Sequence, residues 1–486
     1  MEVGILVILP ALLSLLSWLG SGWALRLTAF AHLGLWIQAI RVTLRIAESG
    51  TITDWGGFFR LDGLSALFLM IIAMVATLTS GFGVFYFRRE MAQQRLTPKK
   101  LSEYLFWFNL LVAAMYLTVT AVNLGVIWVA IEATTVTSIL LVGFDNQRSS
   151  IEAAWKYGLI CSVGIILALI GVMLINFASA SVSGAGDAAL DWSQLLAAAP
   201  KLDGKLFKIA FIFILVGFGT KAGFAPLHTW LPDAYSQAPT PVSALLSGGL
   251  LNCALYGILR TATIVGAAVG TGFVHQFLTG FGLLSILVAI PFLLIQFDLK
   301  RLLAYSSVEN IGLIAFGLGI GGKWAVTGSV LLVFNHALTK CGLFLAVGEI
   351  VRIYHSKQLE RMRGLIKIAP SLAILTCCGL LTLIGAPPFA IFFSKLAILY
   401  GGLQQSRYWP TFWLLALLTF ALVGLFFNFA RVLWGSPERK AKPCPADWPT
   451  LTILSLPGLT MLVTAFYQPL FWKQIVSDAV RIVGGI

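Results

Sequence analysis

Apolar segments long enough to cross a lipid bilayer recur along the whole chain, and short polar or glycine-rich stretches separate them. About 20 consecutive apolar residues span the hydrocarbon core as a helix, which satisfies its own backbone hydrogen bonds where no water is present. The pattern therefore predicts an all-α polytopic membrane protein. We place fourteen transmembrane helices near 3–20, 23–46, 64–87, 104–120, 122–144, 154–177, 206–225, 241–260, 277–297, 301–320, 325–350, 371–399, 409–432 and 450–470.

The segment 261–276 is apolar as well, but its glycines and His275 favour a loop and a helix extension over a separate crossing. No soluble linker or folded domain outside the membrane is indicated. We therefore expect one transmembrane domain over 1–486, which comprises an N-terminal part (1–103), two groups of five helices (104–260 and 277–432) and a last helix (450–470).

Composition favours a membrane protein over a soluble one with several domains. The length alone would suggest about three soluble domains. However, 58% of the 486 residues are hydrophobic, only 11% are charged, and the mean hydropathy is +0.90. The net charge of +13 does not indicate nucleic-acid binding, because the basic residues lie in short loops between apolar segments.

The placement of basic residues predicts the orientation in the membrane. With the N-terminus outside, the inside-facing loops carry nineteen Lys and Arg, the outside-facing segments carry eleven, and three more lysines lie within helices. Basic residues are enriched in cytoplasmic loops, so both termini are expected outside. The inside set comprises Arg26, five residues in 88–100, two in 148–156, two in 300–301, five in 352–367 and four in 431–442.

The cysteines show neither a CxxC pair nor the spacing of metal ligands, and five of the six lie in apolar segments. Cysteine behaves there as a small hydrophobic residue, so we expect no disulfide framework, metal site or iron–sulfur cluster. The first 20 residues lack a basic N-terminal region and are typical of a first transmembrane helix rather than a cleaved signal. The cysteines are Cys161, Cys253, Cys341, Cys377, Cys378 and Cys444.

The stretch from Gly217 to Leu246, GFGTKAGFAPLHTWLPDAYSQAPTPVSALL, combines a lysine inside an apolar run with four prolines. A lysine at the bilayer centre costs roughly 2.5–3.5 kcal/mol on insertion scales, which usually indicates a function. A second apolar run is interrupted at GAPPF and carries Lys395 after the interruption. Paired broken helices in two halves of a chain are typical of an ion path built from inverted repeats. We therefore predict that Lys221 and Lys395 are counterparts.

Glu132 lies within IWVAIEATT, with apolar residues for several positions on each side. A carboxyl group there is either protonated or paired with a cation. Glu132 and Lys221 together suit a proton relay, because a desolvated lysine beside a carboxylate stores and releases a proton as its partner moves. The alternatives are a structural ion pair between the two and a lysine that bonds the backbone carbonyls freed by the helix break.

His336 and Lys340 in FNHALTKCG are four residues apart and therefore share one helix face. An imidazole and an ammonium group facing the same cavity suit a chain of proton transfers, although His336 could instead bond a backbone carbonyl of a neighbouring helix. His228 in PLHTW could line an inside vestibule or cap the broken helix. For Asp62 and Glu309, which we place near helix ends, a capping or loop role is at least as well supported as transport.

Four ionisable groups are thus predicted inside the membrane: Glu132, Lys221, Lys340 and Lys395. Their combined insertion penalty is roughly 10–14 kcal/mol before any pairing, which rivals the whole stability of a typical domain. Water, mutual pairing or both must offset this penalty. Either solution produces a hydrated polar axis through the membrane.

Five stretches together resemble the antiporter-like proton-channel subunits shared by respiratory complex I, membrane-bound hydrogenases and multisubunit cation/proton antiporters. They follow the family's order over roughly 60–400 and read IWVAIEATT, GTKAGFAPLHTWLPDAYSQAPTPVSALL, FDLKRLLAYSSVENIG, FNHALTKCGLF and GAPPFAIFFSK. Within the family, RSSIEAAWKY, LLNCALYGILR and SVENIGLIAFGLGIGG are most similar to component F of hydrogenase-4. Because the chain ends soon after the fourteenth helix, we expect it to lack the long lateral helix of the largest complex I subunit of this kind.

The resemblance implies two inverted five-helix repeats, helices 4–8 and 9–13, each with a half-channel and a broken helix, the seventh and the twelfth. It implies that Glu132 and Lys221 form the coupled pair of the fifth and seventh helices. It also implies that His336 and Lys340 are the central residues of the eleventh helix and that Lys395 is the terminal residue of the twelfth.

The chain departs from the family's pattern in the eighth helix. Where relatives carry a lysine or histidine, this sequence has Ser247 and Asn252. Neither side chain titrates, so a proton would have to pass through water held by hydroxyl and amide groups.

We interpret the chain as a proton-translocating subunit of a multisubunit oxidoreductase, similar to hydrogenase-4 or formate hydrogenlyase, in the inner membrane of a prokaryotic cell. The expected partners are other membrane subunits, peripheral redox subunits, membrane lipid and protons, with sodium left open and no nucleic acid. We expect no cofactor and no catalytic residue on this chain, because no cofactor fingerprint or nucleophile arrangement is present. The alternatives are a subunit of a cation/proton antiporter or complex I-type oxidoreductase, and a passive membrane anchor for a soluble enzyme.

Overall fold

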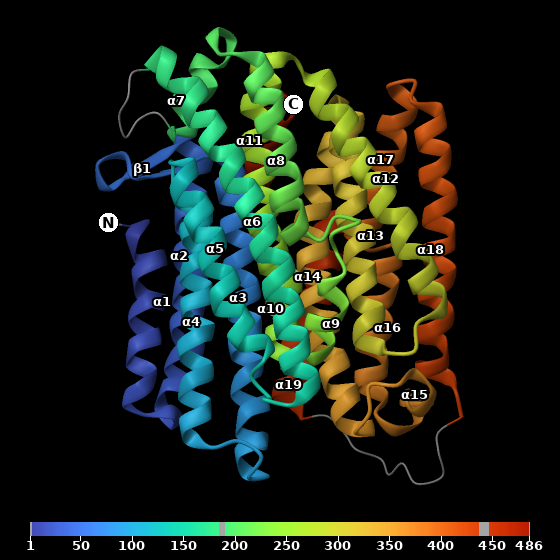
Figure 1. The fold of residues 1–486 in the computed structure, drawn as a ribbon. Coiled ribbons are helices and arrows are strands. Elements are labelled where there is room, and N and C mark those ends of the chain that lie inside the picture. The colour runs from blue at the N-terminus through green and yellow to red at the C-terminus, as the bar shows by residue number, and fades with distance from the viewer. Residues whose placement is uncertain (1, 184–189, 437–446, 486) are drawn as a thin grey trace.

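The computed structural model describes residues 2–183, 190–436 and 447–485 and is a bundle of long helices with a short β-hairpin near one end (Figure 1). The hairpin is antiparallel, with Ile52 opposite Leu61. The N-terminal part comprises α1 (Gly4–Leu16), α2 (Ser21–Ser49), β1 (Ile52–Asp54), β2 (Phe59–Leu61) and α3 (Gly63–Ala92).

The rest of the described chain is helical, and two groups of helices are followed by a C-terminal pair. The first group is α4 (Pro98–Thr120), α5 (Leu124–Val142), α6 (Arg148–Ser183), α7 (Trp192–Ala198), α8 (Gly204–Ala222), α9 (Trp230–Gln237), α10 (Thr240–Leu245) and α11 (Leu251–Val269). The second is α12 (Thr271–Ile295), α13 (Leu299–Ile320), α14 (Gly322–Tyr354), α15 (Leu365–Ile368), α16 (Pro370–Ile384), α17 (Ala390–Gln404) and α18 (Tyr408–Trp434). The pair is α19 (Trp448–Phe466) and α20 (Leu470–Val483).

The prediction of an all-α polytopic membrane protein is confirmed, and each predicted crossing has a helical counterpart. Within the described ranges, eleven helices are long and apolar enough to cross a membrane. The other predicted crossings correspond to the shorter α1, to α8, which carries three lysines, and to the pair α16 and α17. Cys444 and the basic residues at 439–442 of the last predicted inside loop lie outside the described residues.

The two predicted broken helices are present, and both breaks begin at a glycine in the left-handed backbone conformation. α8 ends at Gly223, whose left-handed φ of 88° lets its N–H reach the carbonyls of the last turn. α16 ends in the same way at Gly385, with φ 78°. Left-handed glycine is the usual residue for such a helix end, because a side chain would strain the backbone. Each break also contains a cis peptide bond, before Pro226 and before Pro388.

The segment 261–276 was predicted as a loop and a helix extension, and the extension is present, but the loop is much shorter than expected. α11 continues to Val269, and a single residue, Gly270 with φ 84°, separates it from α12. Only this glycine takes a conformation that a helix excludes; Gly266 lies within α11. Apolar neighbours were sufficient to keep the remaining positions helical, so glycine content was a poor guide to the loop's length.

The C-terminal helix α20 was not predicted. It packs against α2, α3 and α14 and buries Trp472, Ile475, Ala479 and Val483. The spacing of these residues by three or four positions gives one apolar face, which is typical of a helix that lies on a bundle rather than one enclosed by lipid.

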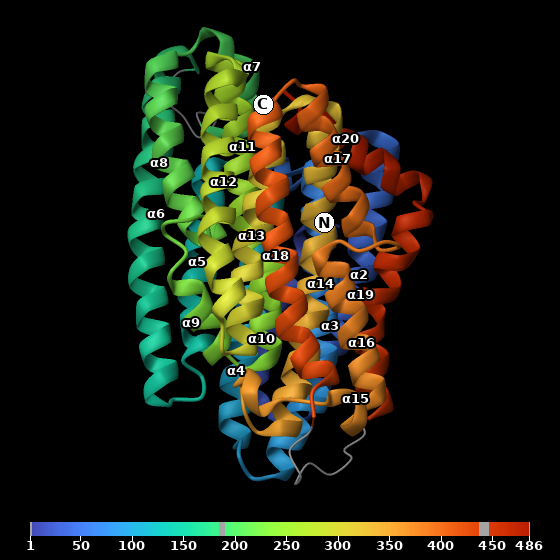
Figure 2. The same ribbon diagram turned by 90° about the vertical axis from the view of Figure 1, so that its right-hand side faces the viewer.

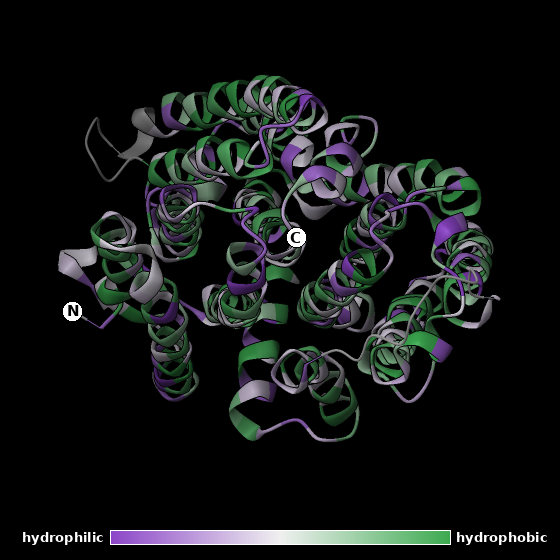
Figure 3. Cartoon of the chain, turned by 90° about the horizontal axis from the view of Figure 1, so that it is seen from below, coloured by the Kyte–Doolittle hydropathy of each residue, from purple (hydrophilic) through white to green (hydrophobic). Residues whose placement is uncertain are grey.

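The helices divide into an inner and an outer set. α3, α11, α13 and α14 are buried along most of their length, whereas α2, α6, α12, α18 and α19 expose much of their apolar surface. Seen from below, hydrophobic residues cover much of the helices, and hydrophilic residues gather on the loops (Figure 3). Polar side chains on the inner helices are therefore enclosed by protein, and this positions the candidate site.

A buried ion pair joins two inner helices. Asp62 accepts a hydrogen bond from the Ser65 N–H at 3.0 Å, which caps α3, and from Arg260 Nη1 of α11 at 2.7 Å. The Arg260 side chain is 1% exposed, and its guanidinium lies 4.1 Å from the centroid of the Trp192 ring in α7. The capping role expected for Asp62 is confirmed, and the pair also fixes α3 to α11 and α7.

Replacing Arg260 with Met should destabilise the fold by about 3–5 kcal/mol, because the Asp62 carboxylate stays buried without its partner. Adding Asp62→Asn should recover most of this loss, since asparagine still caps α3 and no charge remains. The measurement is unfolding of the purified chain in detergent, by heat or by SDS titration. Arg45→Met removes an exposed pair with Glu2 and is the control, with an expected change of at most about 1 kcal/mol. A double variant no more stable than Arg260→Met would contradict this account.

Candidate functional site

Lys221 lies in the last turn of α8, is fully buried, and reaches across to α5. Its Nζ donates to the carbonyl oxygen of Ile131 at 2.7 Å and to the Oγ1 of Thr135. The Thr220 carbonyl, which the break frees, accepts instead from Trp230 Nε1 at 2.9 Å. Lys221 therefore does not serve to bond the carbonyls of its own broken helix, and its partners lie on α5.

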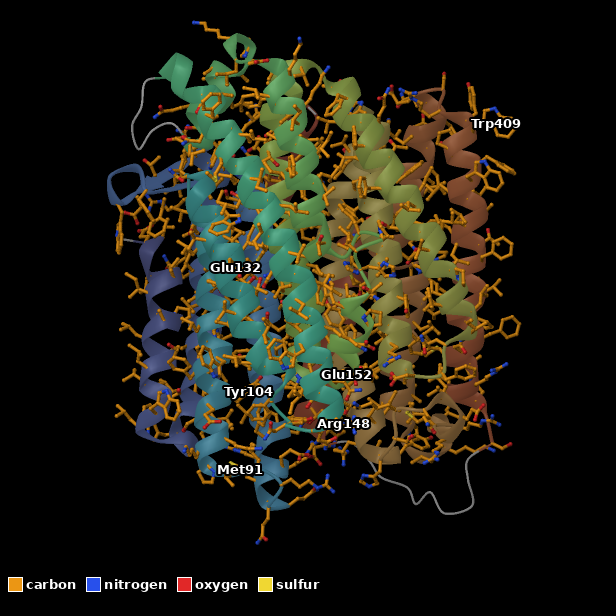
Figure 4. All side chains as sticks on the ribbon, in the orientation of Figure 1. Met91, Tyr104, Glu132, Arg148, Glu152 and Trp409 are labelled. Atoms are coloured by element: carbon orange, nitrogen blue, oxygen red, sulfur yellow. The ribbon has the colours of Figure 1, made fainter. Side chains whose placement is uncertain are left out.

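Glu132 follows Ile131 on α5 and lies near the mid-height of the bundle (Figure 4). Its side chain is partly buried, and its Oε2 is enclosed without a hydrogen-bond partner among the described residues. No ion pair joins Glu132 to Lys221, so the structural bridge considered from the sequence is absent. A carboxylate oxygen in this state is costly, which favours either protonation or a rearrangement that brings a donor to it.

A second glutamate–lysine pair lies at the other helix break. Lys395 of α17 places its Nζ 3.5 Å from Glu309 Oε1 and donates to the carbonyl of Leu383 at 3.3 Å. Leu383 is in the last turn of α16, so this lysine does bond a carbonyl freed by a break. Glu309 is fully buried on the inner helix α13.

The expectation that Glu309 lies near a helix end was wrong, because Glu309 lies in the middle of α13, whose bounds agree with the predicted crossing at 301–320. Its polar neighbours bond within the helix. Ser306 donates to the Leu303 carbonyl at 3.0 Å, and Asn310 donates to the Ser306 carbonyl at 2.8 Å. Such local bonds allow serine and asparagine inside a buried helix.

Lys340 of α14 is fully buried and bonds to α13. Its Nζ donates to the Leu303 carbonyl at 2.7 Å and to the Oγ of Ser306. Ser307 donates to the same Leu303 carbonyl at 3.3 Å, and its Oγ lies 3.0 Å from the Oγ of Ser247. A continuous series of hydrogen bonds therefore runs from Ser247 to Lys340.

A π-helical turn, Leu246–Leu250, separates α10 from α11 and carries Ser247. Asn252 follows this turn, is fully buried, and donates from Nδ2 to the Gly248 carbonyl at 2.7 Å. Its Oδ1 has no partner among the described residues. Turns of this kind occur often at functional sites. No hydrogen bond within the described part of the chain joins Asn252 to Lys221 or Lys340. The Asn252 amide is therefore not a member of the hydrogen-bonded series from Ser247 to Lys340.

The two histidines differ in their surroundings. His336 is fully buried one turn before Lys340, and neither ring nitrogen has a partner among the described residues. The carbonyl bond considered as an alternative is therefore absent. His228 lies in the break between α8 and α9, with its ring centroid 6.2 Å from that of Tyr305 in α13. It is buried but does not line the polar cavity at the lower end of the bundle.

That cavity has a volume of about 590 Å³ and is lined by the ends of α3, α9 and α14, by the starts of α10 and α13, and by loop residues. Lys300 donates to the Ala238 carbonyl at 3.0 Å, and Lys357 donates to the Ser236 carbonyl at 2.7 Å. Burial raises the pKa of the Asp145 carboxyl, against the opposing effect of Lys300 and Lys357. Burial also lowers the pKa of the Lys357 ammonium, against the effect of Asp298 and Asp145.

Sequence reasoning missed the acceptors on which the lysines depend. Thr135, Ser306 and Ser307 were not singled out, although IEATT and AYSSVE place hydroxyl residues inside apolar runs beside a glutamate. That combination was the available signal. Within the described ranges, no group of three or more His, Cys, Asp or Glu side chains is placed to hold a metal ion.

Comparison with known proteins gives a consistent result. A family model described as NADH:quinone oxidoreductase/Mrp antiporter, transmembrane, matches residues 121–422. A hydrogenase-4 component F homolog of Methylacidiphilum infernorum is 37% identical over 388 residues, which cover 80% of this chain and 81% of the relative. A Na⁺/H⁺ antiporter subunit of Alkalihalophilus pseudofirmus is 28% identical over 467 residues, which cover 93% of this chain and 91% of the relative. A chain of the membrane-bound sulfane sulfur reductase, an archaeal respiratory membrane complex, has the same fold, with a TM-score of 0.87 at 23% identity and 100% coverage of both chains.

Gly223→Ala should lower the stability of the fold by about 1–2 kcal/mol, because the new Cβ must adopt a left-handed backbone conformation. That Cβ would also lie 2.8 Å from Leu231 Cδ1. The measurement is the midpoint of thermal unfolding in detergent. Gly280→Ala in α12 is the matched control: its Cβ would meet nothing within 4 Å, and alanine should stabilise the helix by roughly 0.5–1 kcal/mol. Equal midpoints for the two variants would count against the proposed geometry of the break.

Proposed function

Since the chain belongs to the NADH:quinone oxidoreductase/Mrp antiporter transmembrane family, we propose that its buried polar residues form a path for protons across the membrane. The chain is an antiporter-like subunit related to those of hydrogenase-4 and of multisubunit antiporters. The proposed path comprises Glu132, Lys221, His228, Asn252, His336, Lys340 and Lys395, and we add Glu309 and the serines of α13 to it.

The observation that carries this proposal is the contrast between two glutamate–lysine pairs at two broken helices. Glu309 and Lys395 are in contact at 3.5 Å, whereas Glu132 and Lys221 are not ion-paired. If 104–260 and 277–432 are inverted repeats, α5 corresponds to α13 and one break to the other. The same glutamate–lysine pair is then present twice: it is separated in Glu132 and Lys221, and it is in contact in Glu309 and Lys395. Opening such a pair changes the affinity of its lysine for a proton, which is the step that a relay requires.

The hydroxyl groups of α13 support a connection between the two halves. A serine hydroxyl both donates and accepts, so it can pass a proton when it reorients. The Oγ atoms of Ser247 and Ser307 supply such groups where a titratable residue of the eighth helix is missing, and Ser307 and Lys340 both donate to the Leu303 carbonyl. Because that carbonyl only accepts, the transfer between Ser307 and Lys340 requires one of the two side chains to turn toward the other. We therefore infer that this link replaces the missing lysine or histidine.

We further infer that the polar cavity lined by Asp145, Lys300 and Lys357 is the inside mouth of the path, with both chain termini outside. The related solved chain comes from a multisubunit membrane complex, and other membrane subunits are the partners of this chain. Among the alternatives, the 37% identity to a hydrogenase-4 component F homolog supports a redox-driven complex in a prokaryotic inner membrane. Electron transfer in peripheral subunits would then drive the opening and closing of the pairs.

Lys221→Met in the intact complex should abolish proton translocation, because methionine fills a similar space but cannot bind a proton. The measurement is the quenching of a pH-sensitive dye in inverted membrane vesicles, recorded together with the rate of electron transfer. Lys205→Met, on the same helix but exposed, is the control and should behave as wild type. Wild-type proton movement per electron in Lys221→Met would refute the relay. If the chain carries sodium instead of protons, the dye signal should depend on the sodium concentration.

Ser307→Ala should slow proton translocation by roughly fivefold, the equivalent of one hydrogen bond of about 1 kcal/mol. It removes the bond to Ser247 and leaves the bonds of Lys340 in place. Ser329→Ala is the matched control, since this serine is equally buried and bonds only the Ala325 carbonyl of its own helix. The initial rate of dye quenching is compared at equal electron-transfer rates. Equal rates in the two variants would exclude the serine link.

A further inference from the structure

An apolar groove with an arginine pair at one end is lined by residues of α2, α3 and α19. Figure 2 shows the ribbons of these three helices near one another. Its volume is about 530 Å³, and no residue of the proposed proton path lines it. The walls are aliphatic and aromatic and include Phe30, Leu33, Leu78, Phe85, Ile453 and Leu456.

The two arginines lie at the same end of the groove because their helices are antiparallel. Arg26 is near the beginning of α2, and Arg88 is near the end of α3. Both are exposed, and neither has an ion-pair or hydrogen-bond partner among the described residues. The neighbouring Arg89 is different, since it bonds Glu349 at 2.8 Å. Two guanidinium groups without counter-charges thus stand beside an apolar groove.

The groove has the length of one leaflet of a bilayer. Thr77 lines its far end, where the Thr77 hydroxyl donates to the His32 carbonyl of α2 at 2.9 Å. The eleven residue steps from Thr77 to Arg88 span about 16.5 Å along α3 at the usual helical rise. Half of a typical hydrocarbon core is about 15 Å. The arginines therefore stand at the depth of the head groups when Thr77 lies near the bilayer centre.

Between the arginines and Thr77 the lining of the groove is apolar throughout. A hydrocarbon chain that lies along it therefore meets only aliphatic and aromatic side chains.

We propose that this groove binds one anionic phospholipid of the inside leaflet, with its phosphate between Arg26 and Arg88 and one acyl chain along the groove. Guanidinium groups bond phosphate oxygens in pairs, with both charge and geometry favourable. Basic pockets beside transmembrane helices recognise anionic head groups on the cytoplasmic side. A bound lipid would fill the space between α2, α3 and α19.

The test is lipid retention by the full chain, purified in mild detergent and examined by native mass spectrometry. The probes are phosphatidylglycerol and, as the zwitterionic comparison, phosphatidylcholine. Wild type should retain one phosphatidylglycerol with about tenfold preference, the equivalent of one charge-assisted hydrogen bond. Arg26→Gln with Arg88→Gln should lose this preference. Arg431→Gln, an exposed and unpaired arginine at the end of α18, is the matched control and should keep it.

A second variant tests the apolar part of the site without changing its charge. A Cβ at Gly81 would lie 3.6 Å from Ile453 Cδ1, an ordinary contact, so Gly81→Leu should fold and fill the groove. It should lower the retention of phosphatidylglycerol to the level of the arginine double variant. Unchanged retention in either variant, or equal retention of both lipids by wild type, would overturn the proposal. A helix of a partner subunit seated in the groove of the purified complex would overturn it as well.

Discussion

Lysine ammonium groups enclosed by helices take backbone carbonyls of neighbouring helices as acceptors, and the arrangement of the inner helices depends on this. Lys221 bonds the Ile131 carbonyl together with the Thr135 hydroxyl one turn later on α5. Lys340 bonds the Leu303 carbonyl together with a serine hydroxyl one turn later on α13. A helical carbonyl has a second lone pair after accepting its own N–H. A buried lysine can therefore be held without opening either helix, and each bond fixes the spacing of two helices.

The acceptors of Lys221 are neutral, so a carboxylate can compete with them for the ammonium group. Thr135 offers Lys221 a neutral acceptor, while Glu132, on the same helix, offers a charged one that is not in contact. At the second break, Lys395 and Glu309 are already paired. One chain thus contains a paired and an unpaired glutamate and lysine at its two helix breaks.

The parts of the structure that the sequence predicted are those with local causes. A glycine and prolines beside Lys221 and Lys395 predicted both broken helices, because the left-handed turn and the missing N–H act within a few residues. Glu309 was placed near a helix end although the predicted crossing at 301–320 already enclosed it, and its serine and asparagine neighbours bond within α13. The length of a loop was harder to predict, because only one of the glycines at 261–276, Gly270, has a positive φ and separates α11 from α12. The serine link through Ser307 depends on contacts between helices far apart in the sequence, which no local pattern contains.

The arginines at the lower end of the bundle are of two kinds: some pair with carboxylates, and others have no partner among the described residues. A count of basic residues does not separate the two kinds. Arg89 is paired with a buried carboxylate and holds α3 to α14, as Arg260 holds α3 to α11 at the other end. Arg26 and Arg88 have no such partner among the described residues and are exposed at the end of the apolar groove. Pairing removes an arginine from any interaction with lipid, whereas an exposed and unpaired arginine keeps its full charge for the anionic leaflet. The net charge of +13 therefore combines arginines held in ion pairs with arginines that keep their charge for other partners.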